Sequence, residues 1–282
     1  MSDHLPEHPV VYKLWEGQEK PHSRESNVQE HVEDWETIRC VRNITEPTLT
    51  VHPSEGENTG RAVVVIPGGG YEMVCMDHEG YDIAQALAEH GITAAILKYR
   101  LPNPEMSDAP HLVPITDARR ALRLLRTMAG QYGFRTDKVG VMGFSAGSHL
   151  STVAGLWPSE AEDEIPNFAA LIYGVTNITG AMLTWLEEYL YFRKLTEAEL
   201  AQNRLLDLVS EHTPPAFLAH AYDDETCHVT ESILYAERLR ASNVPVEMHL
   251  FAKGGHGFGL GRREDGTDQW LPLFVNWLKR ET

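Results

Sequence analysis

The sequence predicts an α/β fold with a mostly parallel central sheet of about eight strands and helices on both faces. Three observations support this fold class. The chain has 282 residues, 42% of them hydrophobic, which is enough to bury the core of one large domain. Short apolar runs alternate with helix-like stretches along most of the chain. One of these runs, at 138–144, passes directly into a glycine-flanked serine and a helix.

Hydrophobic periodicity places the elements in chain order. Strand-like runs are expected at 37–44 (the weakest), 48–52, 62–67, 92–99, 138–144, 168–174, 216–222 and 246–252. Helix-like stretches are expected at 79–90, 114–131, 146–156, 228–242 and 270–281. After the leading strands the order alternates between strand and helix, which is typical of parallel strands covered on both faces.

Two regions depart from this alternation. Residues 1–36 are rich in His, Glu, Pro and Asp and form a polar N-terminal segment, whereas 37–282 is interpreted as a single α/β domain. A small helical insertion at about 178–212, with helical pieces at 181–193 and 196–208, separates two of the strands. Such an insertion lies above the carboxyl ends of the strands, where open α/β sheets bind ligands. Its aromatic residues are candidates for a substrate cleft, although aromatics more often only pack an insertion onto its domain.

Charge and composition narrow the possible partners and the compartment. The net charge of −17 disfavours nucleic acid and anionic membranes, and no apolar run approaches the roughly 18 residues of a membrane span. The N-terminus lacks the basic and then apolar pattern of a signal peptide. The three cysteines are an odd number without metal-like spacing. We therefore expect a cytoplasmic protein without a bound metal or cofactor.

The glycine-flanked serine is the most informative feature of the chain. Residues 143–147 read Gly-Phe-Ser-Ala-Gly, between an apolar strand and a helix. This is the pattern of a nucleophile elbow, in which a tight turn exposes the serine hydroxyl on a strained backbone. Small flanking residues are needed because a larger side chain would collide with the neighbouring strand or helix. Ser145 is therefore the candidate nucleophile, the alternative being an ordinary glycine-rich turn.

A serine nucleophile needs a base and an acid from loops that follow later strands. The strand at 246–252 is followed by Gly-Gly-His-Gly at 254–257, and the glycines let His256 approach the serine. The strand at 216–222 is followed by Asp223, Asp224 and Glu225. Asp224 is favoured as the acid because it lies one position further into the loop, with Asp223 as a turn former or helix N-cap.

Other histidines and an earlier glycine loop complete the site. His149, His220 and His249 are interpreted as packing residues within the helix or the strands. The strand at 62–67 runs into Gly-Gly-Gly-Tyr at 68–71, where backbone N–H groups can point at a developing negative charge. The Ala146 N–H would be the remaining donor of this oxyanion hole.

Together these motifs resemble the α/β-hydrolase superfamily, and more closely its bacterial branch of acetyl-xylan esterase-like or "xylanase B-like" carbohydrate esterases. The resemblance runs from about residue 41 to residue 278. It also rests on the motifs at 77–80, 97–101, 117–121 and 213–215. Two departures are Ser148, where the family usually has glycine, and the pair at 227–228, where the family favours Val-Pro.

The resemblance also assigns roles by position. It implies Ser145 as nucleophile, His256 as base and Asp224 as acid. The oxyanion donors that it implies are Gly69, Gly70 and Ala146. Apart from the resemblance, Tyr71 of the glycine loop and the insertion residues Trp185 and Tyr189 are expected to bind substrate.

The expected function is a serine esterase that hydrolyses short-chain carboxylic esters, acetyl esters above all, on sugars or oligosaccharides through an acyl-enzyme. The expected partner is a small-molecule ester substrate. The sequence is also compatible with a homo-oligomer. An alternative is an aryl-formamidase or small amide or peptide hydrolase, since the same triad serves both. A non-catalytic ligand-binding member of the fold is a third alternative, disfavoured because the triad and the glycine loop are complete.

Three further groups allow two interpretations each. His78 and Glu79 resemble half a metal site, but a helix start packed beneath the oxyanion loop is favoured. Arg100 and Asp117 either brace the loops near the elbow or form a surface ion pair. Cys75 and Cys227 lie on loops near the expected site and are either reactive thiols or small buried hydrophobic residues.

Overall fold

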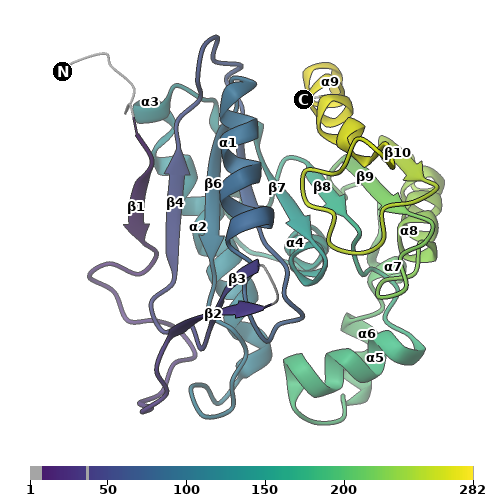
Figure 1. Ribbon diagram of the computed structural model, residues 1–282. Coiled ribbons are helices and arrows are strands. Elements are labelled where there is room, and N and C mark those ends of the chain that lie inside the picture. Colours follow the sequence, from purple (N-terminus) through teal and green to yellow (C-terminus); the bar gives the residue numbers. More distant parts are fainter. Residues whose placement is uncertain (1–7, 36–37, 282) are drawn as a thin grey trace.

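A computed structural model, which describes residues 8–35 and 38–281, has one eight-stranded sheet with helices on both faces (Figure 1). The order of strands across the sheet is β1-β4-β6-β5-β7-β8-β9-β10. The six strands from β6 to β10 in this order are parallel, whereas β4 and β1 are antiparallel to their neighbours. This confirms the predicted fold class.

The main sheet takes its strands from most of the chain. They are β1 (Val10–Lys13), β4 (Thr48–His52), β5 (Ala62–Ile66), β6 (Thr93–Lys98), β7 (Val139–Phe144), β8 (Ala169–Ile172), β9 (Ala216–Ala221) and β10 (Val246–Phe251). All residues of β5, β7, β8 and β9 are buried, as continuous apolar strands covered on both faces must be. The seven strands from β4 onwards lie within a residue or two of the expected positions.

Two strands near the N-terminus differ from the expectation. The weak strand at 37–44 does not join the main sheet: β3 (Ile38–Arg42) pairs with β2 (His31–Trp35) in a separate antiparallel ribbon. The eighth strand of the main sheet is instead β1, which lies within the polar segment 1–36. Periodicity missed β1 because it has only four residues and, on the sheet edge, leaves Val11 62% exposed.

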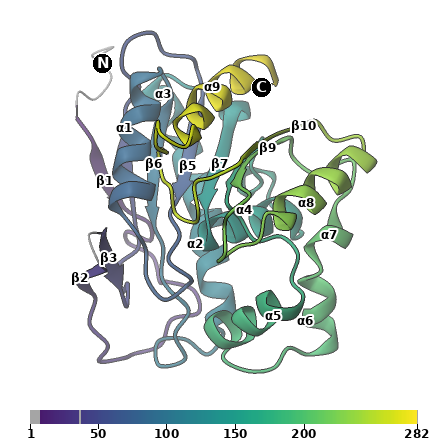
Figure 2. The same ribbon diagram turned by 45° about the vertical axis from the view of Figure 1, so that its right-hand side comes forward.

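The helices cover the sheet in two groups. They include α1 (Asp82–Glu89), α2 (Val113–Thr127), α3 (Ala129–Tyr132), α4 (Ala146–Leu156), α8 (Thr230–Ala241) and α9 (Trp270–Glu281). α1 and α9 lie on one face, and α2, α4 and α8 on the other (Figures 1 and 2). In the part of the chain that the structure describes, no helix combines the length and the apolar character that a membrane span requires.

Short helical turns complete the connections. They are the π-helical turns η1 (Asp77–Tyr81) and η5 (Glu187–Tyr191), and the 3₁₀ turns η2 (Pro110–Leu112), η3 (Thr136–Lys138), η4 (Glu162–Glu164) and η6 (Thr267–Gln269). In the predicted insertion, η5 joins α5 (Gly180–Leu186), α6 (Glu197–Gln202) and α7 (Leu205–Leu208). α6 begins at a capping box, in which the Thr196 hydroxyl accepts from the Glu199 N–H. α5 and α6 lie together at one end of the molecule in both views (Figures 1 and 2).

A buried ion pair ties the N-terminal segment to the sheet. Arg100 and Asp117 are 2.6 Å apart, with side chains 3% and 0% exposed, so the surface alternative was wrong. The Asp117 carboxylate also accepts from the Trp15 indole N–H, and Arg100 donates to the Pro21 carbonyl and the Ser23 hydroxyl. The pair therefore braces the chain that precedes β2 rather than the elbow.

Removing one partner of this pair should be strongly destabilising. We expect Asp117→Ala to lower the free energy of unfolding by about 3–5 kcal/mol, because it leaves a buried guanidinium without its counter-charge. Urea denaturation followed by tryptophan fluorescence measures the change. Asp163→Ala is the matched control, since it breaks an exposed pair with Arg123 and should change stability little. Equal losses in the two variants would contradict the prediction.

Candidate active site

Ser145 occupies the turn between β7 and α4 with a strained backbone. Its φ of +50° and ψ of −121° are rare for a residue with a side chain, which is the strain expected of an elbow. A Cβ on Gly143 would lie 2.3 Å from the Gly147 carbonyl oxygen, and one on Gly147 would lie 2.0 Å from the Ile66 oxygen. Both positions therefore exclude any larger residue.

His256 and Asp224 meet Ser145 at the carboxyl edge of the sheet. The loops after β9 and β10 lie side by side because these strands are parallel neighbours. His256 Nε2 is 2.8 Å from Ser145 Oγ, and His256 Nδ1 is 2.8 Å from Asp224 Oδ2. The three side chains thus form one continuous hydrogen-bonded row, although 111 residues separate Ser145 from His256.

The structure distinguishes the three consecutive acids. Asp224 is 2% exposed, and its Oδ1 accepts from the N–H groups of Thr226 and Cys227. Asp223 instead accepts from the Gly255 N–H at 2.8 Å and so braces the histidine loop. Only Asp224 of the three contacts the imidazole among the described residues, as the sequence interpretation favoured.

The environment shifts the pKa values of both members of this pair. Burial alone would raise the pKa of Asp224, but hydrogen bonds from His220 and His256 outweigh it and hold that pKa well below its usual range. Burial would likewise lower the pKa of His256, but its hydrogen bond to Asp224 prevails and raises it above the ordinary value of 6.5. Asp224 therefore stays ionised and makes the imidazole a stronger base.

The candidate oxyanion residues of the glycine loop and of α4 lie at the same cavity as Ser145. Gly69 and Gly70 have φ values of +123° and +66°, and a Cβ on Gly69 would lie 2.3 Å from the Met73 carbonyl oxygen. Ala146 is the first residue of α4, so its N–H has no acceptor within the helix. These three residues line the same cavity as Ser145 and His256.

This cavity has a volume of about 540 Å³, which suits a small-molecule ligand. The insertion supplies one wall through Met182, Trp185 and Tyr189, and the ribbon contributes Ile38. Trp185 donates from its indole N–H to the Gly70 carbonyl at 3.2 Å. The insertion is therefore fastened directly to the glycine loop.

Tyr71, the third expected substrate-binding residue, lies behind this wall and does not line the cavity. It is 2% exposed and stacks on Trp185 at 5.4 Å. Its hydroxyl is 2.8 Å from His149 Nδ1, and burial lowers the pKa of His149 to about 3. His149 is thus a packing residue, as expected, and Tyr71 supports Trp185. The sequence could not show which aromatic residues line the cavity and which pack behind them, because aromatic residues are suited to both roles.

Two predicted packing histidines differ in their surroundings. His220 is fully buried in β9, with its Nδ1 2.8 Å from Ser232 Oγ and its Nε2 3.2 Å from Asp224 Oδ2. It is therefore a positioning residue for the acid that the sequence interpretation missed; its spacing of four from Asp224 was the only signal. His249 is only half-buried and pairs with Glu247 at 2.9 Å.

Glu79 and the cysteines lie close to the site. Glu79 is buried beneath the glycine loop and accepts from the Gly68 N–H at 2.7 Å. Within the described ranges, no three histidine, cysteine or carboxylate side chains gather closely enough to hold a metal ion.

Cys75 and Cys227 line the cavity but are only 3% and 4% exposed, and burial raises the pKa of Cys75. Cys75 lies 3.3 Å, sulfur to sulfur, from Cys40.

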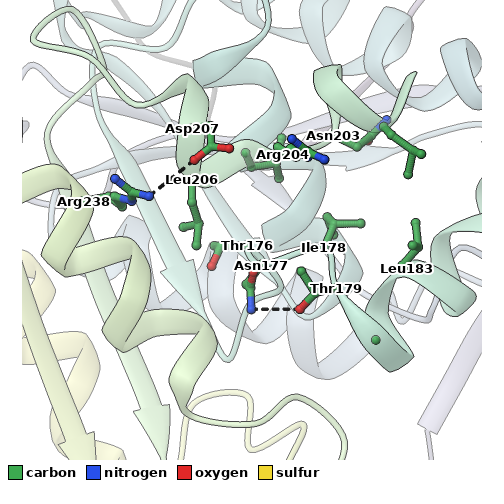
Figure 3. A pocket seen from close by; sticks show the side chains of 13 residues that line it. Thr176, Asn177, Ile178, Thr179, Leu183, Asn203, Arg204, Leu206, Asp207 and Arg238 are labelled. Atoms are coloured by element: carbon green, nitrogen blue, oxygen red, sulfur yellow. Dashed lines mark hydrogen bonds and ion pairs between the residues drawn. The ribbon is translucent and has the colours of Figure 1, made fainter. Parts of the chain in front are cut away.

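A second hollow, of about 550 Å³, lies on the other side of the insertion (Figure 3). Its lining includes Leu183 of α5, whereas Met182 and Trp185 of the same helix line the first cavity. Arg238 and Asp207, both in its lining, form an ion pair at 3.4 Å. None of the candidate catalytic residues lines this hollow, so it is separate from the site around Ser145.

Comparison with known proteins identifies the family of this chain. The family model BD-FAE matches residues 50–239, which include the glycine loop, the elbow and the acid loop. An acetylxylan esterase of Xylanibacter ruminicola is 34% identical over 78% of this chain and 46% of its own length. Endo-1,4-beta-xylanase B of Butyrivibrio fibrisolvens is 32% identical over 77% of this chain and 35% of its own length. The chain thus spans half or less of the length of these curated relatives.

A solved structure matches nearly the whole chain. The crystal structure of an acetyl ester-xyloside bifunctional hydrolase from Caldicellulosiruptor lactoaceticus is 27% identical in sequence, with a TM-score of 0.81. The match covers 99% of this chain and 98% of that one. The likeness therefore includes β1, the ribbon and the insertion as well as the central sheet.

Proposed function

This chain belongs to the BD-FAE family and has the α/β-hydrolase fold. On this premise we propose that it is a carboxylic ester hydrolase, namely a serine esterase acting on short-chain, chiefly acetyl, esters of sugars. The predicted family resemblance is thereby confirmed. The observation that carries the proposal is the row of two 2.8 Å hydrogen bonds that joins Ser145, His256 and Asp224. The family and these relatives give no support to the alternative of an amide hydrolase.

In the proposed mechanism His256 Nε2 takes the proton of Ser145 Oγ as that oxygen attacks the acyl carbonyl carbon. The N–H groups of Gly69, Gly70 and Ala146 stabilise the negative charge on the former carbonyl oxygen. The tetrahedral intermediate collapses, and His256 passes its proton to the departing alcohol. A water molecule, deprotonated by His256, then attacks the acyl-enzyme and releases the acid and free Ser145. Asp224 orients the imidazole and stabilises its charged form throughout.

The cavity wall supports a sugar as the alcohol part of the ester. Trp185 and Tyr189 offer aromatic faces on which the apolar face of a pyranose ring can lie. Glu72 and Thr226 line the same cavity and offer polar groups to which sugar hydroxyls can bond. We further propose a cytoplasmic location, because the acidic chain carries three free cysteines, and therefore acetylated oligosaccharides rather than intact polymer as substrates.

Substrate choice tests this proposal directly. We expect initial rates on p-nitrophenyl esters to be highest for acetate and propionate and to fall steeply towards octanoate. Acetylated xylo-oligosaccharides should be deacetylated faster than polymeric acetylxylan at equal ester concentration. A preference for long acyl chains would contradict the short-chain assignment. Hydrolysis of aryl formamides without any ester hydrolysis would instead favour the amide hydrolase.

The pH dependence of kcat/KM should report the raised pKa of His256. Below that pKa the imidazole is charged and cannot accept the serine proton, so activity should rise as the pH increases through it. Because Asp224 raises the pKa, we expect the midpoint of this rise to lie above 6.5. Rates on p-nitrophenyl acetate between pH 5 and 10, read at the isosbestic wavelength of p-nitrophenol, measure the midpoint. A midpoint at or below 6.5 would contradict the prediction.

A further inference from the structure

Glu79 is a buried carboxylate for which neither the family motif nor the proposed mechanism provides a task. It lies in the π-helical turn η1 and is 3% exposed. Its Oε2 accepts from the Gly68 N–H at 2.7 Å, and its Oε1 accepts from the Tyr173 hydroxyl at 2.9 Å. Among the described residues no lysine or arginine pairs with it, and His78, at 3.6 Å, is its single basic neighbour.

Packing alone does not explain such a group. Burying a carboxylate costs free energy unless hydrogen bonds compensate for the lost water, and an apolar side chain would fill the same space without that cost. The two donors face different oxygens of Glu79, and an amide in the same position would turn an NH₂ group towards one of them. A carboxylate at position 79 is therefore explained by the two hydrogen bonds that it accepts, from Gly68 and from Tyr173.

The Gly68 contact acts on the oxyanion loop. Gly68 immediately precedes Gly69 and Gly70, whose N–H groups are the proposed oxyanion donors. A Cβ on Gly68 would lie 2.9 Å from Glu79 Oε2 and 2.8 Å from Ser145 Cβ. The Gly68 peptide is thus held between the carboxylate and the nucleophile, so the hydrogen bond to Glu79 sets its orientation.

The Tyr173 contact acts on the histidine loop. Tyr173 follows β8, is fully buried and has a φ of +39°, which is strained for a residue with a side chain. Its hydroxyl donates to Glu79 and accepts from the Gly259 N–H at 3.1 Å. Its ring packs edge-on against His256 at 5.1 Å and against Phe258 at 4.5 Å. Tyr173 therefore packs against the imidazole of His256 and fixes the end of the histidine loop through Gly259.

We propose that Glu79 and Tyr173 are positioning residues that act as one unit. They form a buried bridge that fixes the position of the oxyanion loop relative to the loop that carries His256. Neither residue lines the cavity around Ser145. The bridge rests on the proposed function, because its purpose is to fix the oxyanion donors relative to nucleophile and base. Misplacement of about 1 Å can cost roughly 10²-fold in rate, so such a bridge contributes to catalysis without touching substrate.

Kinetics of Glu79→Gln, Tyr173→Phe and the double variant test the unit. We expect each single variant to lose about 10–10²-fold in kcat on p-nitrophenyl acetate, with KM nearly unchanged. The double variant should be no slower than the slower single variant, because either change already breaks the bridge. An alkyl boronic acid, which forms a tetrahedral adduct with an active-site serine, should bind more weakly by a similar factor in all three.

Stability needs a separate control because Glu79 is buried. Asp117→Asn removes another buried carboxylate, one that bonds Arg100 and Trp15 and does not line the cavity around Ser145. This variant should lower Tm while leaving kcat and boronic acid affinity unchanged. Unchanged kcat in Glu79→Gln, or losses that simply multiply in the double variant, would overturn the proposal. If Glu79→Gln does not fold, Tyr173→Phe decides alone, and wild-type kcat in that variant would overturn it.

Hydrogen exchange gives a readout that does not depend on esterase activity. In Glu79→Gln we expect faster amide exchange both in the oxyanion loop at 67–75 and in the histidine loop at 254–260. Asp117→Asn should leave exchange in both loops unchanged. If the wild type hydrolyses no ester, faster exchange in both loops would still support the bridge while the esterase proposal fails. Faster exchange in the oxyanion loop alone would overturn a bridge between the two loops.

Discussion

Replacing Ser145 by alanine is expected to lower kcat by on the order of 10⁶, the effect of removing a nucleophile that acts as one unit with its base. The cavity and the proposed oxyanion donors remain in Ser145→Ala, so KM should change far less. Initial rates on p-nitrophenyl acetate measure the loss, and a fluorophosphonate probe should label the wild type at Ser145 but not the variant.

Ser148→Ala is the matched control for this experiment. Ser148 lies three residues further along α4, is fully buried, and its hydroxyl has no hydrogen-bond partner among the described residues. Its removal should leave both activity and labelling intact. Retention of more than about one per cent of activity in Ser145→Ala, against the expected loss, would contradict the assignment of the nucleophile.

Asp224→Asn should give the second-largest effect, a loss of about 10⁴-fold in kcat. An asparagine side chain can present its NH₂ group to His256, which favours the wrong tautomer of the imidazole. Two backbone N–H groups, of Thr226 and Cys227, already occupy the other carboxylate oxygen. The asparagine oxygen is therefore expected to remain with the backbone and its nitrogen to face His256. Single-turnover and steady-state rates on p-nitrophenyl acetate measure the loss.

Asp223→Asn distinguishes the acid from its neighbour. Asp223 accepts one hydrogen bond, from the Gly255 N–H, and an asparagine oxygen can accept it equally well. We therefore expect less than a tenfold loss in this variant, a small effect beside that of a triad residue. A larger loss in Asp223→Asn than in Asp224→Asn would show that the wrong aspartate had been assigned.

The insertion is joined to the oxyanion loop by direct contacts of Trp185. Substitutions in the insertion are therefore expected to affect catalysis as well as substrate choice. Trp185 bonds to the Gly70 carbonyl, stacks on Tyr71 and so reaches His149 behind the elbow. A change in the substrate wall is thus transmitted to the loop that carries the proposed oxyanion donors. We therefore expect substitution of Trp185 to alter both substrate contact and the orientation of Gly70.

Local rules were sufficient for much of the fold. Continuous apolar runs identified the buried parallel strands because these strands are covered on both faces. The same reasoning missed β1, whose four residues sit on an edge with one exposed face, and assigned β3 to the wrong sheet. Strand pairing is not a local property: nothing within 37–44 indicates that its partner is β2 rather than the main sheet.

The sequence by itself identified most of the strands and helices and the candidate catalytic residues. The glycines around Ser145 and His256 and the acidic run after β9 act over a few residues, so a linear reading identifies the candidate nucleophile and base and narrows the acid to three neighbours. Only the tertiary structure decided which carboxylate reaches the imidazole, that Tyr71 supports Trp185 instead of lining the cavity, and that Glu79 joins Gly68 to Tyr173. The physical reason is sequence distance. The contacts of Asp224 with His256, of Glu79 with Tyr173 and of Tyr71 with Trp185 link residues 32, 94 and 114 positions apart. Only the packing of the sheet and its helices brings such residues within hydrogen-bonding or stacking distance.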